Sequence, residues 1–365
     1  MRHVLFLISQ DSTKRGGSEE IMGMVVRYFL KQGDDVHVFF LMKKRFGDWE
    51  KIPFNNLHLY YSRGGGKLGI FSVIRNFWRV HNKVFDYSFS SIVECTGLIG
   101  IMSRLGILHI ESIVGRESTM VFSRFSGMQL WINKMMYRFG YPAVKLLICQ
   151  TQLMKNELLS YVPWLENGRT VAVIPNPVDF DKIHEKEVQV INVKNYVPYV
   201  VTAGRLHPVK GYDVLIKSFN IFLKDHPDFK LIILGRDGGQ GEQLQRIISE
   251  LDLQNKVILH GEVDNVYPFF KQAQLCVISS FVEGFPNVLL QMMSQSNKVV
   301  STVCAGGIDN IKGLFTCPPN NVELLAQAMV DCINADTGKN KELFEIELQS
   351  RSFDMFIQKI FSYTS

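Results

Sequence analysis

Short apolar runs bounded by turn residues alternate along the chain with longer stretches whose apolar residues recur at helical spacing. HVLFLIS (3–9) predicts a first strand, and SEEIMGMVVRYFLKQG (18–33) predicts a helix capped by Ser18 and ended by Gly33. Further strands are predicted, with helices between them, for DVHVFFLM (35–42), YSFSSIVEC (87–95), HIESIVG (109–115) and KLLICQ (145–150). This alternation is typical of a parallel sheet covered by helices.

A second series with the same rhythm begins after VIPNPVDFDKI (173–183) and a polar stretch. Its strands are predicted at YVVTAGRL (199–206), KLIILGRDG (230–238), KVILHGEV (256–263), QLCVISS (274–280) and KVVSTV (298–303). Its helices are predicted at YDVLIKSFNIFLKDHP (212–227), EQLQRIISELDL (242–253), YPFFKQA (267–273), PNVLLQMMSQ (286–295) and NVELLAQAMVDCINAD (321–336). The pattern therefore predicts two α/β domains, 1–177 and 198–342, joined by a linker at 178–197. An amphipathic helix near 343–365 is expected to pack back on the first domain.

The length of 365 residues and the hydrophobic fraction of 46% agree with two domains of ordinary size. The first apolar run is too short for a secretion signal, and no uncharged stretch approaches the roughly 20 residues that cross a bilayer. The six cysteines are scattered and form no CxxC pair. We therefore expect a reduced, cytoplasmic chain without disulfides or a structural zinc.

The net charge of +5 is distributed unevenly, because residues 43–145 carry fifteen Lys and Arg against six Asp and Glu. Several of these basic residues stand beside aromatic ones, as in Arg75, Trp78 and Arg79, and in Trp131 and Lys134. Three interpretations remain open: a solvated basic face, a surface that meets anionic lipid, and a nucleic-acid surface. No recognised nucleic-acid motif accompanies the charge, which disfavours the last of these.

Two loops that follow predicted strands of the second series have residues suited to phosphate. AGRLHPVKG places Arg205 and Lys210 in a Gly/Pro loop, and two such cations suit a diphosphate, although they could also be solvated loop residues. LGRDGGQGE (234–242) is a second strand-to-helix turn that begins at Gly235. Its spacing is not that of a dinucleotide fingerprint, so it is either a structural turn or a turn whose amides approach a ligand.

The segment FVEGFPNVLLQ (281–291) places Glu283 and Gly284 just before a helix in which Pro286 is expected at the first position. The amides of Phe285, Asn287 and Val288 are then at the positive end of that helix, where an oxygen-rich ligand binds readily. Gln291 lies eight residues after Glu283, which at helical spacing corresponds to a rotation of roughly 80° about the helix axis. Both side chains can therefore contact one site at different depths.

GRLHPVKG, LGRDGGQGE and EGFPNVLLQ, in this order and spacing, resemble the family 4 retaining glycosyltransferases with the GT-B architecture. VIPNPVDF at the linker and Gly16-Gly17 after the first strand agree with this resemblance, which covers about 170–312 strongly and the earlier chain more loosely. The resemblance implies two Rossmann-like domains facing across a cleft. It also implies a nucleotide-sugar donor on the second domain and an acceptor on the first.

Carried over by motif, Arg205 and Lys210 would hold the donor diphosphate, and Glu283 would bind sugar hydroxyls at the reacting face. Gln291 stands where the family usually has a second Glu that binds the ribose. An amide can still bond two adjacent hydroxyls but loses charge-assisted bonds, so we expect a nucleotide affinity weaker by roughly 1 kcal/mol. The donor-site prediction also includes Gly17, Gly235, Gly284, Phe285, Asn287 and Val288.

The first domain departs from the family pattern. Where many members have a His, SIVGRESTM (112–120) has Arg116 and Glu117, which we assign either to the donor–acceptor cleft or to a structural ion pair. One D-x-D, Asp179-Phe180-Asp181, occurs in the linker, where we expect a solvated turn and not a metal site. No metal or other cofactor is expected, because cations and helix amides would stabilise the leaving diphosphate.

The resemblance therefore implies a hexosyltransferase that moves a sugar from a nucleotide sugar, with UDP as the nucleotide, to a glycan or polyprenyl-diphosphate-linked acceptor. Such a reaction would serve cell-surface polysaccharide or O-antigen assembly, in the cytoplasm or peripherally on the inner-membrane surface. The alternatives are a non-catalytic nucleotide-sugar-binding or scaffold subunit, which Gln291 favours, and a GT-B sugar-nucleotide epimerase.

Overall fold

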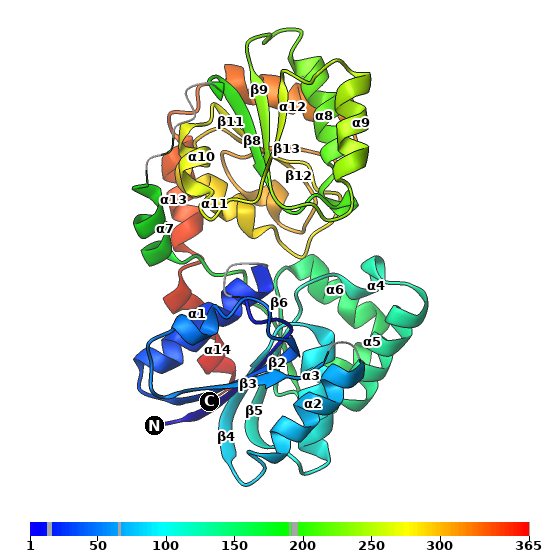
Figure 1. The fold of residues 1–365 in the computed structure, drawn as a ribbon, viewed down its shortest axis with the longest axis vertical. Helices are drawn as coiled ribbons and strands as arrows, with labels where there is room; N and C mark the ends of the chain where they lie inside the picture. The colour runs from blue at the N-terminus through cyan, green and yellow to red at the C-terminus, as the bar shows by residue number, and fades with distance from the viewer. Residues whose placement is uncertain (13–16, 65–66, 190, 192–195, 365) are drawn as a thin grey trace. The chain divides into compact units, whose positions relative to one another are not determined.

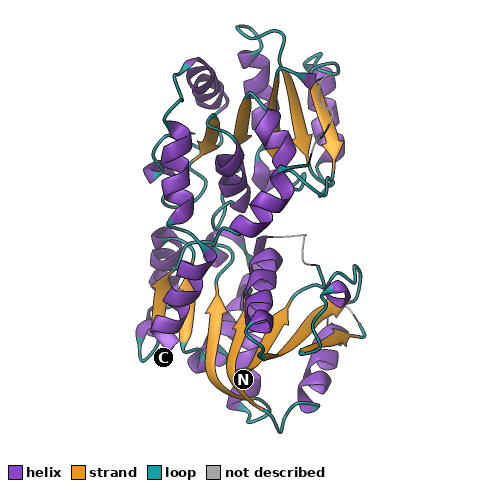
Figure 2. Ribbon diagram, turned by 90° about the vertical axis from the view of Figure 1, so that its left-hand side faces the viewer, coloured by secondary structure: helices purple, strands orange, loops and turns teal. Residues whose placement is uncertain are grey.

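The computed structural model describes residues 1–12, 17–64, 67–189, 191 and 196–364, which form two compact units. Unit 1 contains residues 1–177 and 354–365, and unit 2 contains residues 178–353. Figure 1 traces the chain through both units, and Figure 2 shows strands with helices on either side of them in each. Each unit is therefore a layered α/β fold, as the alternating pattern of the sequence predicts.

Unit 1 is built on a seven-stranded parallel sheet in the order β3-β2-β1-β4-β5-β6-β7. Its strands are β1 (His3–Ile8), β2 (Asp35–Lys43), β3 (Leu57–Ser62), β4 (Val84–Ser90), β5 (His109–Arg116), β6 (Leu146–Cys149) and β7 (Thr170–Val173). Its helices are α1 (Gly17–Lys31), α2 (Lys67–Trp78), α3 (Val93–Arg104), α4 (Val121–Arg124), α5 (Gly127–Phe139), α6 (Gln152–Tyr161) and α14 (Phe353–Thr364). Gly16 of the predicted loop lies outside the described residues.

Unit 2 is built on a six-stranded parallel sheet in the order β10-β9-β8-β11-β12-β13. Its strands are β8 (Tyr199–Ala203), β9 (Lys230–Leu234), β10 (Val257–Gly261), β11 (Leu275–Ile278), β12 (Val299–Thr302) and β13 (Phe315–Cys317). Its helices are α7 (Phe180–Glu187), α8 (Tyr212–Phe222), α9 (Gly241–Glu250), α10 (Tyr267–Gln272), α11 (Asn287–Gln295), α12 (Val322–Asn334) and α13 (Asn340–Gln349).

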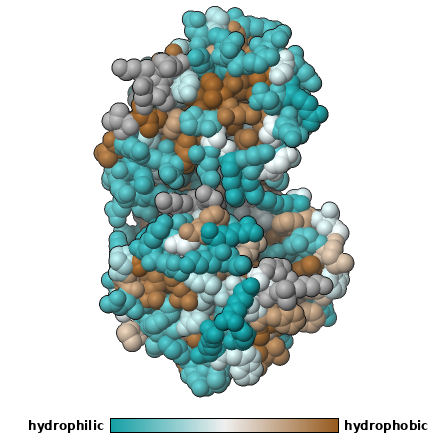
Figure 3. Space-filling view, in the orientation of Figure 1, coloured by the Kyte–Doolittle hydropathy of each residue, from teal (hydrophilic) through white to brown (hydrophobic). Residues whose placement is uncertain are grey.

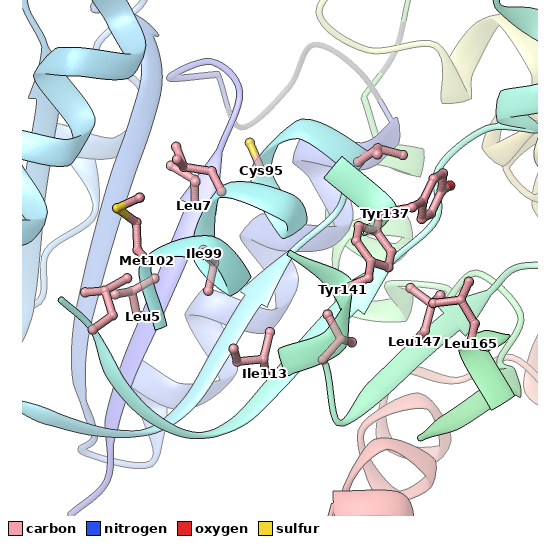
Figure 4. Packing of buried hydrophobic residues seen from close by; sticks show 14 of the residues in the cluster. Leu5, Leu7, Cys95, Ile99, Met102, Ile113, Tyr137, Tyr141, Leu147 and Leu165 are labelled. Carbon is pink, nitrogen blue, oxygen red and sulfur yellow. The ribbon is translucent and has the colours of Figure 1, made fainter. Parts of the chain in front are cut away.

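The central strands are almost fully buried, which explains their continuous apolar runs. All six residues of β1 except His3 are buried, and every residue of β8 is buried. A strand in the middle of a parallel sheet is covered on both faces by helices, so it has no solvent face to alternate with. Figure 4 shows how Leu5 and Leu7 of β1 lie near Ile99 and Met102 of α3 in one of these apolar layers.

Several boundaries differ from the sequence prediction. The run 87–95 is not one strand, because β4 ends at Ser90 and helix α3 begins at Val93. Ser18 is inside α1 and its hydroxyl bonds to Ser91, so it does not cap the helix. The helix expected near 343–365 is two helices with a break at 350–352, and they belong to different units.

The expected linker also has structure of its own. Asp179 caps α7 by accepting a hydrogen bond of 3.0 Å from the amide of Lys182, so the D-x-D is a helix start and not the solvated turn that the sequence suggested. The helix that follows belongs to unit 2.

Helix α14 packs on unit 1. Phe361 of α14 lies with its ring centroid 5.7 Å from that of Tyr87 and 6.2 Å from that of Phe29, and the Arg2 guanidinium lies over its ring. Lys145 Nζ donates a hydrogen bond of 2.6 Å to the carbonyl of Thr364. The expectation that the last segment packs on the first domain thus describes α14 but not α13.

Candidate functional site

The strand order of unit 2 brings the candidate residues together. β8 and β11 are neighbours in the sheet, and the chain leaves β8 toward β9 on one side and β11 toward β12 on the other. Ligands of open parallel sheets bind at such a switch point, outside the carboxyl ends of the strands. Arg205 and Lys210 follow β8, and Glu283 follows β11, so all three are at this edge.

Lys210 and Glu283 form an ion pair, with 2.6 Å between Nζ and Oε1. Their side chains are 21% and 18% exposed, so both remain within reach of a ligand. The contact uses one of the three protons of the lysine ammonium, which leaves donors for an anionic oxygen. A cation and a carboxylate held in hydrogen-bond contact at the edge of the sheet are the centre of the candidate site.

Hydrogen bonds between the two loops fix this pair. Ser279 Oγ donates to the carbonyl of Lys210 over 2.8 Å, and the Phe281 amide donates to the carbonyl of Val209 over 2.8 Å. The Glu283 amide donates to the carbonyl of Cys304 over 2.7 Å, which ties the β11 loop to the loop after β12. The pair is therefore positioned by main-chain contacts and not by flexible side chains alone.

Gly211 permits this close approach. Its φ of 61° is in the left-handed region, and a Cβ at this position would lie 2.3 Å from the carbonyl oxygen of Ser279. Any side chain would push the loops apart, which explains the glycine directly after Lys210.

The turn after β9 packs against the Arg205 loop. Leu206 donates its amide to the carbonyl of Arg236 over 2.9 Å, and a Cβ on Gly238 would lie 2.5 Å from Cγ of Arg205. Gly235 is needed for the same reason, because its Cβ would lie 1.9 Å from the carbonyl oxygen of Gly204. The Arg205 side chain itself is exposed.

The amides of this turn are already used. Oδ1 of Asp237 accepts hydrogen bonds from the amides of Gly239, Gln240 and Gly241 at 2.9, 3.1 and 3.0 Å. These bonds, that from Gly239 first, lower the pKa of Asp237. Of the two interpretations of LGRDGGQGE, the structure favours the structural turn, since its own aspartate takes the donors that a ligand would need.

Helix α11 begins at Asn287 with Pro286 as its cap, one residue later than the sequence suggests. Gly284 and Phe285 are buried before it, and the Phe285 ring lies 4.4 Å from the Arg351 guanidinium carbon. Asn287 and Val288 are half-buried at its amino end. Gln291 is half-buried in the second turn, and within the described residues no hydrogen bond joins its side chain to Glu283.

In unit 1, Arg116 ends β5 and Glu117 follows it, and their side chains are 3% and 2% exposed. They do not pair with each other. Arg116 Nη2 donates to Oδ1 of Asn176, while Glu117 accepts from the hydroxyls of Tyr137 at 3.1 Å and Tyr141 at 2.7 Å. The structural ion pair considered above is therefore not found in the described residues.

Burial dominates the electrostatics of these two groups. It raises the pKa of Glu117 to about 7 and lowers the pKa of Arg116 to about 10. Arg116 Nε and Nη1 are buried without a hydrogen-bond partner among the described residues. These two nitrogens carry three N–H donors, an exception to the rule that buried donors are hydrogen-bonded. Gly17, the remaining predicted residue of unit 1, is exposed at the start of α1.

Sequence reasoning did not identify Tyr137 and Tyr141 as the partners of Glu117, which they contact from α5 and from the short turn after it. Figure 4 shows the two rings side by side in the apolar layer of unit 1. Their spacing of four residues within an otherwise basic segment was the available signal.

All six cysteines are free and buried, and burial raises the pKa of Cys304 to about 12.

Two Rossmann-like parallel α/β units with a cation–carboxylate pair at the switch point of the second define a protein of the GT-B class. Solved structures agree with this fold: the TM-score is 0.79 for a sucrose-phosphate synthase of Thermosynechococcus elongatus, with 16% identity over 99% of this chain and 98% of that one. It is 0.77 for Anabaena HepE in complex with UDP and glucose, with 19% identity over 99% of each chain.

Comparison of sequences points to the same kind of protein. Residues 197–335, most of unit 2, match the family model "Glycosyl transferases group 1". It is 34% identical to an uncharacterised glycosyltransferase of Methanocaldococcus jannaschii over 51% of this chain and 45% of the relative. It is 25% identical to another from Haemophilus influenzae over 94% of both.

A third relative is the N-acetylgalactosamine-N,N'-diacetylbacillosaminyl-diphospho-undecaprenol 4-alpha-N-acetylgalactosaminyltransferase of Campylobacter jejuni, which is 27% identical over 50% of this chain and 48% of that protein. The chain thus spans about half the length of this relative and of the one from Methanocaldococcus jannaschii. The family-model match over residues 197–335 and the fold of the solved structures confirm the resemblance inferred from the loops of unit 2.

Proposed function

We propose that this protein is a retaining glycosyltransferase that moves a sugar from a nucleotide sugar, a UDP-sugar, to an acceptor hydroxyl. The observation that carries the proposal is the Lys210–Glu283 pair at 2.6 Å, at the carboxyl ends of β8 and β11. Lys210 and the exposed Arg205 supply positive charge for the diphosphate. Glu283 supplies an acceptor for sugar hydroxyls.

The reaction proceeds on one face of the sugar. The bond between the anomeric carbon and the diphosphate oxygen breaks, and the bond to the acceptor oxygen forms on the same side. The departing diphosphate takes the acceptor's proton. Lys210 and Arg205 stabilise the charge that develops on the diphosphate, which is the step where fixed cations contribute most. The proposed reaction uses no metal ion, so the protein should remain active in the presence of a chelator.

Two named proteins support the choice of donor and acceptor. Anabaena HepE has been solved with UDP and glucose, and the Campylobacter jejuni relative acts on a diphospho-undecaprenol glycan. We assign a UDP-sugar to unit 2 and a glycan or polyprenyl-diphosphate-linked acceptor to unit 1, as in polysaccharide or O-antigen assembly.

The surface of unit 1 favours an acceptor presented at an anionic membrane. Phe71 and Trp78 on α2 are 71% and 54% exposed beside the exposed Arg75 and Arg79. On α5, Met128 and Trp131 are 72% and 57% exposed and line a shallow apolar pocket.

Aromatic rings beside basic groups suit the membrane interface. Figure 3 shows hydrophobic residues in separate patches on a mostly hydrophilic face. Within the described part of the chain, no helix has the length and apolar character needed to cross a bilayer.

The decisive experiment identifies the co-purified nucleotide sugar by mass spectrometry and then measures nucleotide release and glycoside formation from UDP- and GDP-sugars with a lipid-diphosphate acceptor. A transferase gives equal amounts of free nucleotide and glycoside. Nucleotide release without a glycoside would indicate an epimerase. Binding without release would indicate a non-catalytic subunit, the alternative that Gln291 favours.

A further inference from the structure

A cluster of histidines and one aspartate lies at the amino ends of β1, β2 and β3, the sheet edge opposite to the carboxyl ends. The parallel register pairs His3 with Asp35 and His37 with His58. Asp35 and His37 are two residues apart on one strand and therefore share a face of the sheet. Four groups able to bind a metal ion are thus brought together by register alone.

Three of these groups converge on one point. Nδ1 of His3 lies 2.9 Å and Nε2 of His37 lies 3.0 Å from the same Oδ2 of Asp35. The three candidate ligand atoms all lie within 4.8 Å of one another. A tetrahedral ion with bonds of about 2.0–2.2 Å requires ligand atoms roughly 3.3–3.6 Å apart, so small side-chain movements suffice.

Lys83 shows that this point already attracts a cation. Its Nζ lies 3.1 Å from Oδ2 of Asp35 and 3.1 Å from Nε2 of His37. One imidazole nitrogen can donate or accept a hydrogen bond but cannot do both, so Nε2 cannot satisfy the carboxylate and the ammonium together. An ion placed there accepts electron pairs from Nε2 and Oδ2 at once. The Lys83 side chain is 42% exposed and can move into solvent.

The surrounding residues hold the ligands in position. The Tyr60 hydroxyl lies 3.0 Å from Nδ1 of His37, which leaves Nε2 directed at the cluster. His58 lies 2.7 Å from the second oxygen of Asp35 and stacks on His37 with 4.6 Å between ring centroids. Partners of this kind orient the ligands of protein metal sites. The His37 side chain is 1% exposed and that of His3 is 36% exposed, so an ion enters from the His3 side.

We propose that His3, Asp35 and His37 form a binding site for a divalent transition-metal ion, with Zn²⁺ as the ion that best suits two imidazoles and one carboxylate. This donor set favours Zn²⁺ and its neighbours over Mg²⁺ or Ca²⁺, which prefer oxygen ligands only. Water completes the coordination, and Lys83 leaves as the ion enters. The site belongs to unit 1 and takes no part in the sugar transfer proposed above.

The test is calorimetric titration of untagged, chelator-treated protein with Zn²⁺, with the absorption spectrum of bound Co²⁺ reporting coordination geometry. We expect one ion per chain. His3→Ala and Asp35→Asn should each weaken binding at least tenfold. Lys83→Met should strengthen binding, because it removes the competing ammonium. His109→Ala, which removes an exposed histidine at the amino end of β5, is the matched control and should change nothing.

His3→Ala decides the outcome, because its exposed side chain can be removed with little effect on folding, which the unliganded melting temperature verifies. Zn²⁺ binding that is absent, or that is unchanged in His3→Ala, would overturn the proposal, as would weaker binding by Lys83→Met. These results do not depend on nucleotide release, so failure here and failure of the proposed transfer reaction are separable.

Discussion

Each unit places a cation and a carboxylate at the carboxyl edge of a parallel sheet, but the two pairs differ in how they are held. In unit 2, Lys210 and Glu283 come from different strands, contact each other and remain about one-fifth exposed. In unit 1, Arg116 and Glu117 are chain neighbours, nearly fully buried, and bonded to different partners.

The difference bears on what each pair can do. An ion pair that solvent still reaches is only weakly stabilising, so a diphosphate can compete for the lysine at little cost. A buried charge is expensive unless it is satisfied, so Glu117 with its two tyrosines must act mainly on stability. We therefore expect substitutions of Lys210 or Glu283 to change the rate of the reaction, and substitutions of Glu117 to change the stability of the folded protein.

Lys210→Met is the sharpest test of the first half of this comparison. In the proposed mechanism Lys210 neutralises the leaving diphosphate, so nucleotide release should fall by roughly 10²–10³-fold while the protein stays folded. The matched control is Lys217→Met, an exposed lysine on α8. If both variants lose the same amount of activity, the Lys210 assignment is wrong.

Glu117→Gln tests the second half. The pKa of this carboxyl is raised to about 7 from 4.5, so the folded state holds its proton more tightly than the unfolded state. Wild-type stability should therefore fall as pH rises from about 4.5 to 7, by an amount on the order of 3 kcal/mol.

The neutral amide should abolish this slope, and urea unfolding at several pH values measures it. Glu111→Gln, which changes an exposed carboxyl on β5, the strand that Glu117 follows, should keep the slope. A slope that persists in Glu117→Gln would mean that another group titrates.

Binding to lipid vesicles compares the contribution of basic residues on unit 1 with that of basic residues on unit 2. Arg75→Gln with Arg79→Gln should weaken binding to phosphatidylserine vesicles by about 2 kcal/mol, since each surface charge contributes about 1 kcal/mol. Arg246→Gln with Lys341→Gln removes the same charge from exposed positions of unit 2 and should have little effect. Equal losses would indicate attraction by net charge and not by a defined surface.

Gln291→Glu is expected to have the smallest effect. A carboxylate at this position would restore charge-assisted bonds to the ribose, worth roughly 1 kcal/mol, or about a fivefold lower donor KM with unchanged kcat. Gln245→Glu on the exposed face of α9 controls for added charge. An unchanged donor KM would remove Gln291 from the ribose site.

The sequence predicts strands and helices of unit 2 well because buried central strands give unbroken apolar runs and their loops contain Gly and Pro. It does not predict which strands are neighbours. Lys210 and Glu283 are 73 residues apart and meet only because β8 lies beside β11. The family resemblance, not the periodicity, suggested that they share a site.

Short or partly exposed elements were missed for a physical reason. β13 has three residues, and none of the first five residues of β3 is fully buried, so neither gives a clear apolar run. The sequence also gives no sign of the cluster of His3, Asp35 and His37. A search for metal ligands at fixed spacing along the chain cannot detect ligands that the parallel register of two strands brings together.

The return of α14 to unit 1 limits how the protein can be divided. A fragment that stops at residue 177 would uncover the rings of Phe29 and Tyr87 and leave the Lys145 ammonium without its carbonyl partner. An expression design for unit 1 alone should therefore graft 354–364 onto 1–177 through a flexible connection, and a simple truncation is expected to aggregate.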